Sequence, residues 1–240
     1  MTKLQGNKSN NTALILGTLI AAALIALALF AGRGKNDAKA QADTASGAAV
    51  KAQFDLSNKP VVGEASAPVE MIVVEDFKCP ACKQFEGSIF LKVENDYVRS
   101  GKVKVYSVTW PFLAEIAKLP EDDSKYAAQA GECAFEHGGN DAFRQYKTIL
   151  FRAQEDENKV WATKERLKEL AANVPAIDQA KFGECLDSDA TAARVDANEA
   201  EVKASGVNGT PSVFINGDKV ENPGDYAQLQ QAIDAALAKK

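Results

Sequence analysis

Two cysteines separated by two residues are the part of this sequence best suited to chemistry. Cys79, Pro80, Ala81 and Cys82 follow a short apolar run and begin a segment with helical spacing. Only the thiolate attacks a disulfide, and a free cysteine, with a pKa of about 8.5, is mostly protonated at neutral pH. Unpaired N–H groups and the positive dipole end at a helix start stabilise the anion, and Pro80 is tolerated in the first turn. We therefore expect Cys79 to attack and Cys82, deeper in the helix, to resolve the mixed disulfide.

The same spacing also occurs in zinc sites and in inert structural disulfides. A zinc site needs two further ligands at a matching spacing. Cys133 and Cys185 lie far apart on separate predicted helices, and His137 is the single histidine of the chain. A site scattered over these residues is the less favoured alternative, so we predict no metal and no cofactor.

The elements that position the two cysteines follow from the apolar periodicity. Residues 69–75 form an apolar run after Pro68 and predict a buried strand. Residues 79–100 carry apolar side chains at spacings of three and four and predict a helix that ends before Gly101. Residues 102–110 alternate and predict a second strand. The order strand, helix, strand favours a parallel pair joined by a right-handed crossover.

The remaining sequence predicts a helical insertion followed by a hairpin and a last helix. Apolar stripes over about 121–205 indicate roughly four or five short helices. Residues 211–215 are rich in β-formers, Asn216 and Gly217 are a two-residue hairpin signal, and residues 218–221 supply the partner strand. Residues 226–237 predict a final amphipathic helix. The fold class is α/β, with the order β-α-β, helical insertion, β-β-α.

The N-terminal part differs from the rest in composition. Residues 13–31 carry no charge, a length that crosses a hydrocarbon core of about 30 Å and exceeds a usual signal-peptide core. We predict a cytoplasmic tail over 1–11, a transmembrane anchor over 12–31 (or a cleaved signal peptide), a flexible linker over 32–53 and a folded domain over 54–240. Lysines and arginines flank the apolar run on both sides, so the positive-inside rule does not decide its orientation.

Charge excludes one class of function. The net charge is −5, and the sequence has no stripe of basic residues. Of all residues, 46% are apolar and 25% are charged. These values are typical of a globular domain and argue against a nucleic-acid partner.

A second motif stands far from the cysteines, where Gly209, Thr210 and Pro211 precede a predicted strand. A proline at such a place often only marks an edge strand. Placed after a helical insertion and before a hairpin, it matches the cis-proline loop that faces the two cysteines in thioredoxin folds. From about Gly63 onward the chain resembles the DsbA-like disulfide oxidoreductases, which are thioredoxin folds with an inserted helical domain. The resemblance is carried by residues 67–69, 74–82, 182–188 and 206–217.

The resemblance implies roles for the residues that match. Cys79 would be the nucleophile and Cys82 the resolving thiol. Thr210 and Pro211, with Pro211 in the cis form, would hold a substrate backbone beside the sulfur. Two departures bear on oxidising strength. Ala81 stands where many members have a histidine, and Val73 stands where many have an acidic residue, with Glu75 and Asp76 as the nearest carboxylates. The resemblance therefore implies a milder oxidant than the strongest relatives.

Cys133 and Cys185 fall on apolar faces of the insertion. Two separate buried thiols are one reading. We favour a structural disulfide, because the cysteine count is even and the other pair is already assigned. In the chain-entropy model such a bridge contributes roughly 4 kcal/mol. It would also indicate an oxidising compartment.

Together these observations predict a monomeric thiol–disulfide oxidoreductase outside the cytoplasm, in the periplasm or cell envelope, tethered by its N-terminal helix. It would donate the Cys79–Cys82 disulfide to reduced, unfolded secreted or membrane proteins. The family resemblance implies re-oxidation by a membrane partner of the DsbB or vitamin K epoxide reductase type. The alternatives are a reductase or isomerase of the same fold, and a non-catalytic, chaperone-like module.

Overall fold

The computed structural model describes residues 54–239. The predicted cytoplasmic tail, membrane anchor and linker over 1–53 lie outside these described residues. Within 54–239, no helix combines the length and the apolar character needed to cross a membrane.

A five-stranded sheet, counted over the described residues, forms the centre of the fold in the order β1-β3-β2-β4-β5. The parallel pair is β2 (Val69–Glu75) and β3 (Val103–Thr109), as the strand–helix–strand order predicts. The hairpin of β4 (Ser212–Ile215) and β5 (Asp218–Val220) adds to β2 in antiparallel orientation. The two-residue strand β1 (Val61–Val62) pairs with β3 and was not predicted, because so short a segment has no periodicity to detect.

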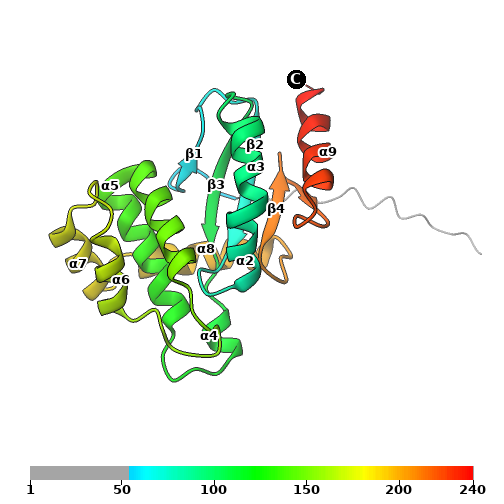
Figure 1. Cartoon of the computed structure of the whole chain (residues 1–240). Coiled ribbons are helices and arrows are strands. Elements are labelled where there is room, and N and C mark those ends of the chain that lie inside the picture. The colour runs from blue at the N-terminus through cyan, green and yellow to red at the C-terminus, as the bar shows by residue number, and fades with distance from the viewer. Residues whose placement is uncertain (1–53, 240) are drawn as a thin grey trace, which may run out of the picture. The chain divides into compact units, whose positions relative to one another are not determined.

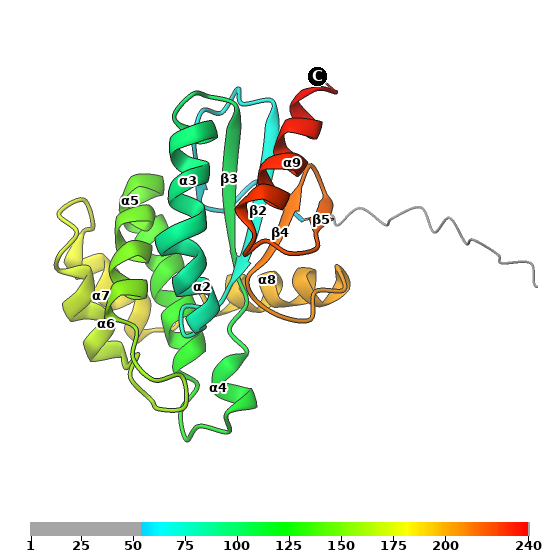
Figure 2. The ribbon, with the colours of Figure 1, turned by 45° about the vertical axis from the view of Figure 1, so that its right-hand side comes forward.

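Both faces of β2 are buried, which explains its continuous apolar run. On one face Val69, Met71 and Val73 pack against the helix that follows the cysteines and against α9 (Tyr226–Leu237). On the other face Ile72 and Val74 pack in a cluster that includes Val202 of α8 (Ala192–Ala204). Figure 2 shows this layering, with α2, α3 and α9 on one side of the sheet and α8 on the other. The end of β2 is thus held from both sides.

The helix after the cysteines runs from residue 80 to residue 98 in four consecutive segments. These are α2 (Pro80–Gln84), the π-helical Phe85–Phe90, α3 (Leu91–Val93) and the π-helical Glu94–Val98. Gly101 follows with a positive φ of 70°, the conformation expected of a residue just past a helix end. The predicted helix is present, and its π-helical stretches are a local widening that the apolar spacing did not reveal.

The insertion begins after α4 (Leu113–Ile116) and packs beside the sheet (Figure 1). It contains α5 (Asp123–Ala153), α6 (Lys164–Ala171), α7 (Gln179–Asp187) and then α8. The 31 residues of α5 form two helices that meet at a kink at Gly139, whose φ of 75° no ordinary helical residue adopts, so the several helices predicted from the apolar stripes are present.

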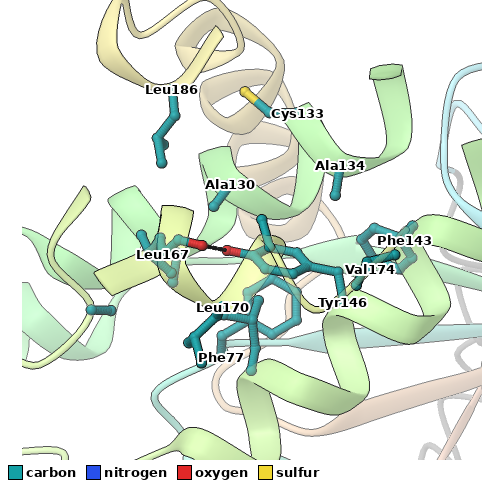
Figure 3. Close-up of a cluster of buried hydrophobic side chains, with 14 of the residues drawn as sticks. Phe77, Ala130, Cys133, Ala134, Phe143, Tyr146, Leu167, Leu170, Val174 and Leu186 are labelled. Carbon is teal, nitrogen blue, oxygen red and sulfur yellow. Dashed lines mark hydrogen bonds between the residues drawn. The ribbon is translucent and has the colours of Figure 1, made fainter. Parts of the chain in front are cut away.

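The core of the insertion reaches the active-site end of the sheet. Tyr146 lies at its centre, donates a hydrogen bond of 2.9 Å to the Leu167 carbonyl and packs edge-on against Phe182. Phe77, two residues before the first cysteine, belongs to the same apolar cluster, as Figure 3 shows. The segment that leads into the cysteines is therefore built partly from the insertion's own core.

A disulfide joins Cys133 of α5 to Cys185 of α7, with a Cα–Cα distance of 6.0 Å. Both residues are buried, and Leu186 beside Cys185 fills the same cluster. The bridge therefore ties two helices of the insertion together.

We expect the double variant Cys133→Ala/Cys185→Ala to lose about 2–5 kcal/mol of unfolding free energy, because the unfolded chain regains the freedom that the bridge removes. Urea unfolding measures this loss. Wild-type protein unfolded and refolded under reducing conditions is the matched control, since it lacks the bridge but keeps both side chains. Equal stability of oxidised wild type and variant would contradict a stabilising bridge.

Candidate active site

Cys79 and Cys82 are placed by the junction of β2 and α2. Cys79 is the N-cap residue of α2, with φ −74° and ψ 119°, and Pro80 occupies the first helical position. Cys82 lies one turn further on. Both cysteines are free, with 7% and 1% of their surface exposed, respectively. Both residues are buried, and Cys79 is the more exposed of the two.

The environment of Cys79 favours its anion. A hydrogen bond with the Cys82 thiol is the largest influence, and N–H groups of Cys82 and Ala81 add to it, while burial opposes them. The net effect lowers the pKa of Cys79 to about 6. Most of the Cys79 thiol is therefore ionised at neutral pH.

Cys82 is held in the opposite state. Burial raises its pKa well above the usual range, and the neighbouring Cys79 and the carboxylate of Glu75 raise it further. The pair therefore carries a single charge on the outer sulfur, and its inner member remains a thiol that donates a hydrogen bond. This division of roles is what a nucleophile and a resolving thiol require.

The loop at Thr210–Pro211 faces the pair. The peptide bond between these residues is cis. The Thr210 carbonyl oxygen lies 3.4 Å from the Cys79 sulfur. The approach follows from topology, because β4 begins at Ser212 opposite Val74, near the end of β2, in an antiparallel register. A hollow of about 320 Å³ beside it is lined by Ala81, Phe85, Ile89 and Pro211, among others.

A buried charge cluster lies behind the cysteines. Lys147 of α5 places its Nζ 2.8 Å from Glu75 Oε1 and 3.2 Å from Glu86 Oε2. Burial raises the pKa of Glu75 even though Lys147 opposes the shift. The pKa of Lys147 is also raised, because the attraction of both carboxylates outweighs the effect of burial. Sequence reasoning named Glu75 as a nearby carboxylate but missed Lys147, since nothing in the sequence indicates which helix of the insertion faces β2.

The residue before Cys79 ties the site to the insertion. The Lys78 ammonium is fully buried, 2.5 Å from Asp123 Oδ1 and 2.8 Å from the Lys159 carbonyl oxygen. The other Asp123 oxygen accepts hydrogen bonds from the N–H groups of Trp161 and Ala162. Asp76 accepts hydrogen bonds from the N–H groups of Lys78, in the same turn, and of Phe112, after β3, and burial raises its pKa to about 6.

Comparison with known proteins places this arrangement in a family. A family model described as Thioredoxin matches residues 55–235, which is most of the chain. The chain belongs to the thioredoxin family, as a DsbA-like thiol–disulfide oxidoreductase.

The relatives agree with this assignment. The probable disulfide bond formation protein D of Bacillus anthracis is 29% identical over 97% of this chain and 100% of its own length. The crystal structure of oxidised BdbD from Bacillus subtilis covers 79% of this chain and 98% of its own, with a TM-score of 0.72 and 29% identity. Chlamydia trachomatis DsbA, at 22% identity, shares the fold with a TM-score of 0.68 over 78% of this chain and 95% of its own.

The structure of this DsbA-like oxidoreductase brings together most of the residues that the sequence singled out. Pro80 and Ala81 form the first turn of α2 between the two cysteines, and the Thr210–Pro211 loop lies opposite. The disulfide between Cys133 and Cys185 belongs to the insertion and is not part of this cluster.

The pKa of Cys79 gives a pH-dependence that can be measured. A thiol whose pKa is depressed on folding contributes stability that is fully present above the unfolded pKa of about 8.5 and is lost as pH falls through the folded pKa. We expect a titration of the reduced protein, followed by thiolate absorbance, to show a midpoint at about 6.

The pKa of Cys79 can also be tested through the pH dependence of the protein's stability. Reduced wild type should lose stability relative to the non-titrating variant Cys79→Ser as pH is lowered toward about 6, and Cys82→Ser should not remove the titration. A midpoint near that of free cysteine, or no pH-dependent difference from Cys79→Ser, would contradict the assigned thiolate.

Proposed function

We propose that this protein is a thiol–disulfide oxidase that acts outside the cytoplasm and introduces disulfides into reduced, unfolded secreted or membrane proteins. The observation that carries the proposal is the single favoured thiolate on Cys79. Any interaction that stabilises the thiolate stabilises the reduced form of the pair, and therefore makes the corresponding disulfide a better oxidant. The names of the Bacillus relatives, which are disulfide bond formation proteins, support the same direction.

The reaction then proceeds by two exchanges. A substrate thiolate attacks the Cys79 sulfur of the Cys79–Cys82 disulfide, that bond breaks, and Cys82 leaves and takes up a proton. A second substrate thiolate attacks the substrate sulfur of the mixed disulfide and releases Cys79 as its stabilised thiolate. The substrate loses two electrons and the cysteine pair gains them.

The hollow beside Pro211 gives substrates a place to bind. We assign Thr210 and Pro211 to the substrate backbone and the hollow lined by Ala81, Phe85 and Ile89 to substrate side chains. The hollow is apolar at Phe85 and Ile89, and unfolded chains expose apolar side chains that fit such a surface.

Membrane attachment and re-oxidation complete the proposal. The uncharged run over residues 12–31 would anchor the domain, with residues 32–53 as its linker and residues 1–11 in the cytoplasm. A buried disulfide between Cys133 and Cys185 supports an oxidising compartment. A membrane protein of the DsbB or vitamin K epoxide reductase type would regenerate the Cys79–Cys82 disulfide, and the oxidase would act as a monomer.

The direction of the reaction is tested by the reduction potential of the Cys79–Cys82 pair, measured by equilibration with glutathione. Strong oxidants of this superfamily lie at about −120 mV and reductants at about −270 mV. We expect a value on the oxidising side, above about −200 mV, and catalysis of the oxidative refolding of a reduced protein. Cys79→Ala is the control and should lose this activity. A value near about −270 mV would favour a reductase, and equal activity of wild type and Cys79→Ala would favour a non-catalytic module.

The anchor is tested by fractionation of cells that produce the full chain. We expect the protein in the membrane fraction, resistant to carbonate extraction, with its folded domain accessible to protease outside the cytoplasm. Replacing Leu24 and Leu27 by arginine should release the attachment, because charged residues at the centre of an apolar span cost about 2.5–3.5 kcal/mol each. A wild-type protein that is shorter at its N-terminus and fully soluble would indicate the cleaved signal peptide instead.

A further inference from the structure

Gln154 connects the helical insertion to the backbone of the first cysteine. It is the C-cap residue of α5, directly after Ala153, and only 9% of its surface is exposed. Its side-chain Nε2 donates hydrogen bonds of 2.8 Å to the Phe77 carbonyl and 3.0 Å to the Cys79 carbonyl. A single amide group thus holds two carbonyls, one on each side of Lys78.

The contact is reciprocal. The Lys83 ammonium, on the first turn of the helix that Cys79 caps, donates a hydrogen bond of 3.1 Å to the backbone carbonyl of Gln154. The Cys79 carbonyl also accepts the first hydrogen bond of that helix, from the Lys83 N–H at 3.1 Å. Gln154 therefore binds the same Cys79 carbonyl oxygen that accepts the first hydrogen bond of α2.

The direction of the Cys79 backbone matters for its sulfur. The N–H groups of Ala81 and Cys82 can lower the pKa of the sulfur only while Cys79 keeps its extended N-cap conformation at the start of the helix. The peptide plane after Cys79 is held by the helix, so a change in ψ of Cys79 would turn its Cα and side chain relative to the start of α2. Because Gln154 holds the Phe77 carbonyl before the Cys79 Cα and the Cys79 carbonyl after it, the amide limits this rotation and with it the position of the sulfur.

We propose that Gln154 is a positioning residue of the active site, which holds the Cys79 backbone so that the sulfur faces the N–H groups at the start of α2. The proposal rests on the role of Cys79 as the nucleophile in the proposed function, and it assigns part of that chemistry to the insertion. Gln154 does not touch the sulfur and acts only through the backbone.

The insertion offers a control for this contact in Gln179, a side-chain amide that is more exposed than Gln154. The Nε2 of Gln179 donates hydrogen bonds of 3.0 Å to the Ala171 carbonyl, at the end of α6, and of 3.1 Å to the Ile177 carbonyl, before α7. It is a side-chain amide that binds backbone carbonyls of the same subdomain, but none of its partners belongs to the active-site segment. Losing its hydrogen bonds should affect the stability of the insertion without moving Cys79.

The test compares Gln154→Met, Gln154→Glu and Gln179→Met in the full chain. Each methionine keeps the length of the side chain and removes its donors, while the glutamate places an anion against the two carbonyls. For each protein we would measure the thiol pKa of Cys79, the equilibrium constant with glutathione and the midpoint of thermal unfolding.

We expect the pKa of Cys79 to rise by about half a unit or more in Gln154→Met, and further in Gln154→Glu. The equilibrium constant with glutathione should shift about threefold toward a weaker oxidant. Gln179→Met should leave both thiol measurements at the wild-type value, whatever its effect on the unfolding midpoint.

Two outcomes would overturn the proposal. Wild-type thiol pKa and equilibrium constant in both Gln154 variants would show that the contact is structural only. Equal shifts in Gln154→Met and Gln179→Met would show a general effect of a weakened insertion. Failure of the proposed function would look different, because the wild-type Cys79 itself would then titrate like a free cysteine or the pair would have a reducing potential.

Discussion

The sulfur of Cys79 depends on hydrogen-bond donors that converge on one point, the start of α2. The Cys82 thiol and the N–H groups of the first turn supply them, and together they outweigh the cost of burying a charge. The neighbouring strands place the groups on which this balance depends. The end of β2 delivers Cys79 to the helix start, and the antiparallel pairing of β4 brings the Thr210–Pro211 loop against it. If the end of β2 did not place Cys79 at the first turn of α2, the thiolate would lose these hydrogen-bond donors.

The helical insertion is part of this balance and does more than cover the sheet. Three consecutive residues before α2 each contact it. Phe77 packs in its core, Lys78 forms a buried ion pair with Asp123, and the Cys79 carbonyl accepts a hydrogen bond from Gln154. Breaking a buried ion pair by removing one partner costs about 3–5 kcal/mol, because a charge is then left without its partner. Movement of the insertion away from the sheet would therefore disturb the active-site turn directly.

The sequence was sufficient for the features that depend on local pattern, and insufficient for those that depend on packing between distant segments. The apolar run of β2, the helix start at the cysteines and the hairpin at Asn216 have local signals, and the bounds of β2 were predicted to the residue. The kink of α5 also has a local signal, the pair Gly138 and Gly139, whereas the contacts of Gln154 have none. Gln154 follows the last apolar stripe of α5 and precedes an acidic run, so in the sequence it is indistinguishable from a solvated loop residue.

The missing acidic residue at Val73 illustrates why packing changes the interpretation of a departure from a family pattern. Side chains alternate along a strand, so Val73 and Glu75 point to the same face of β2, and Glu75 lies nearer the strand end that leads to the cysteines. A carboxylate is therefore still buried on this face, and its charge raises the pKa of Cys82. It is tolerated there because Lys147 of the insertion neutralises it. In this chain the buried charge near the resolving thiol thus depends on a partner from the insertion, which links the state of Cys82 to the same subdomain that positions Cys79.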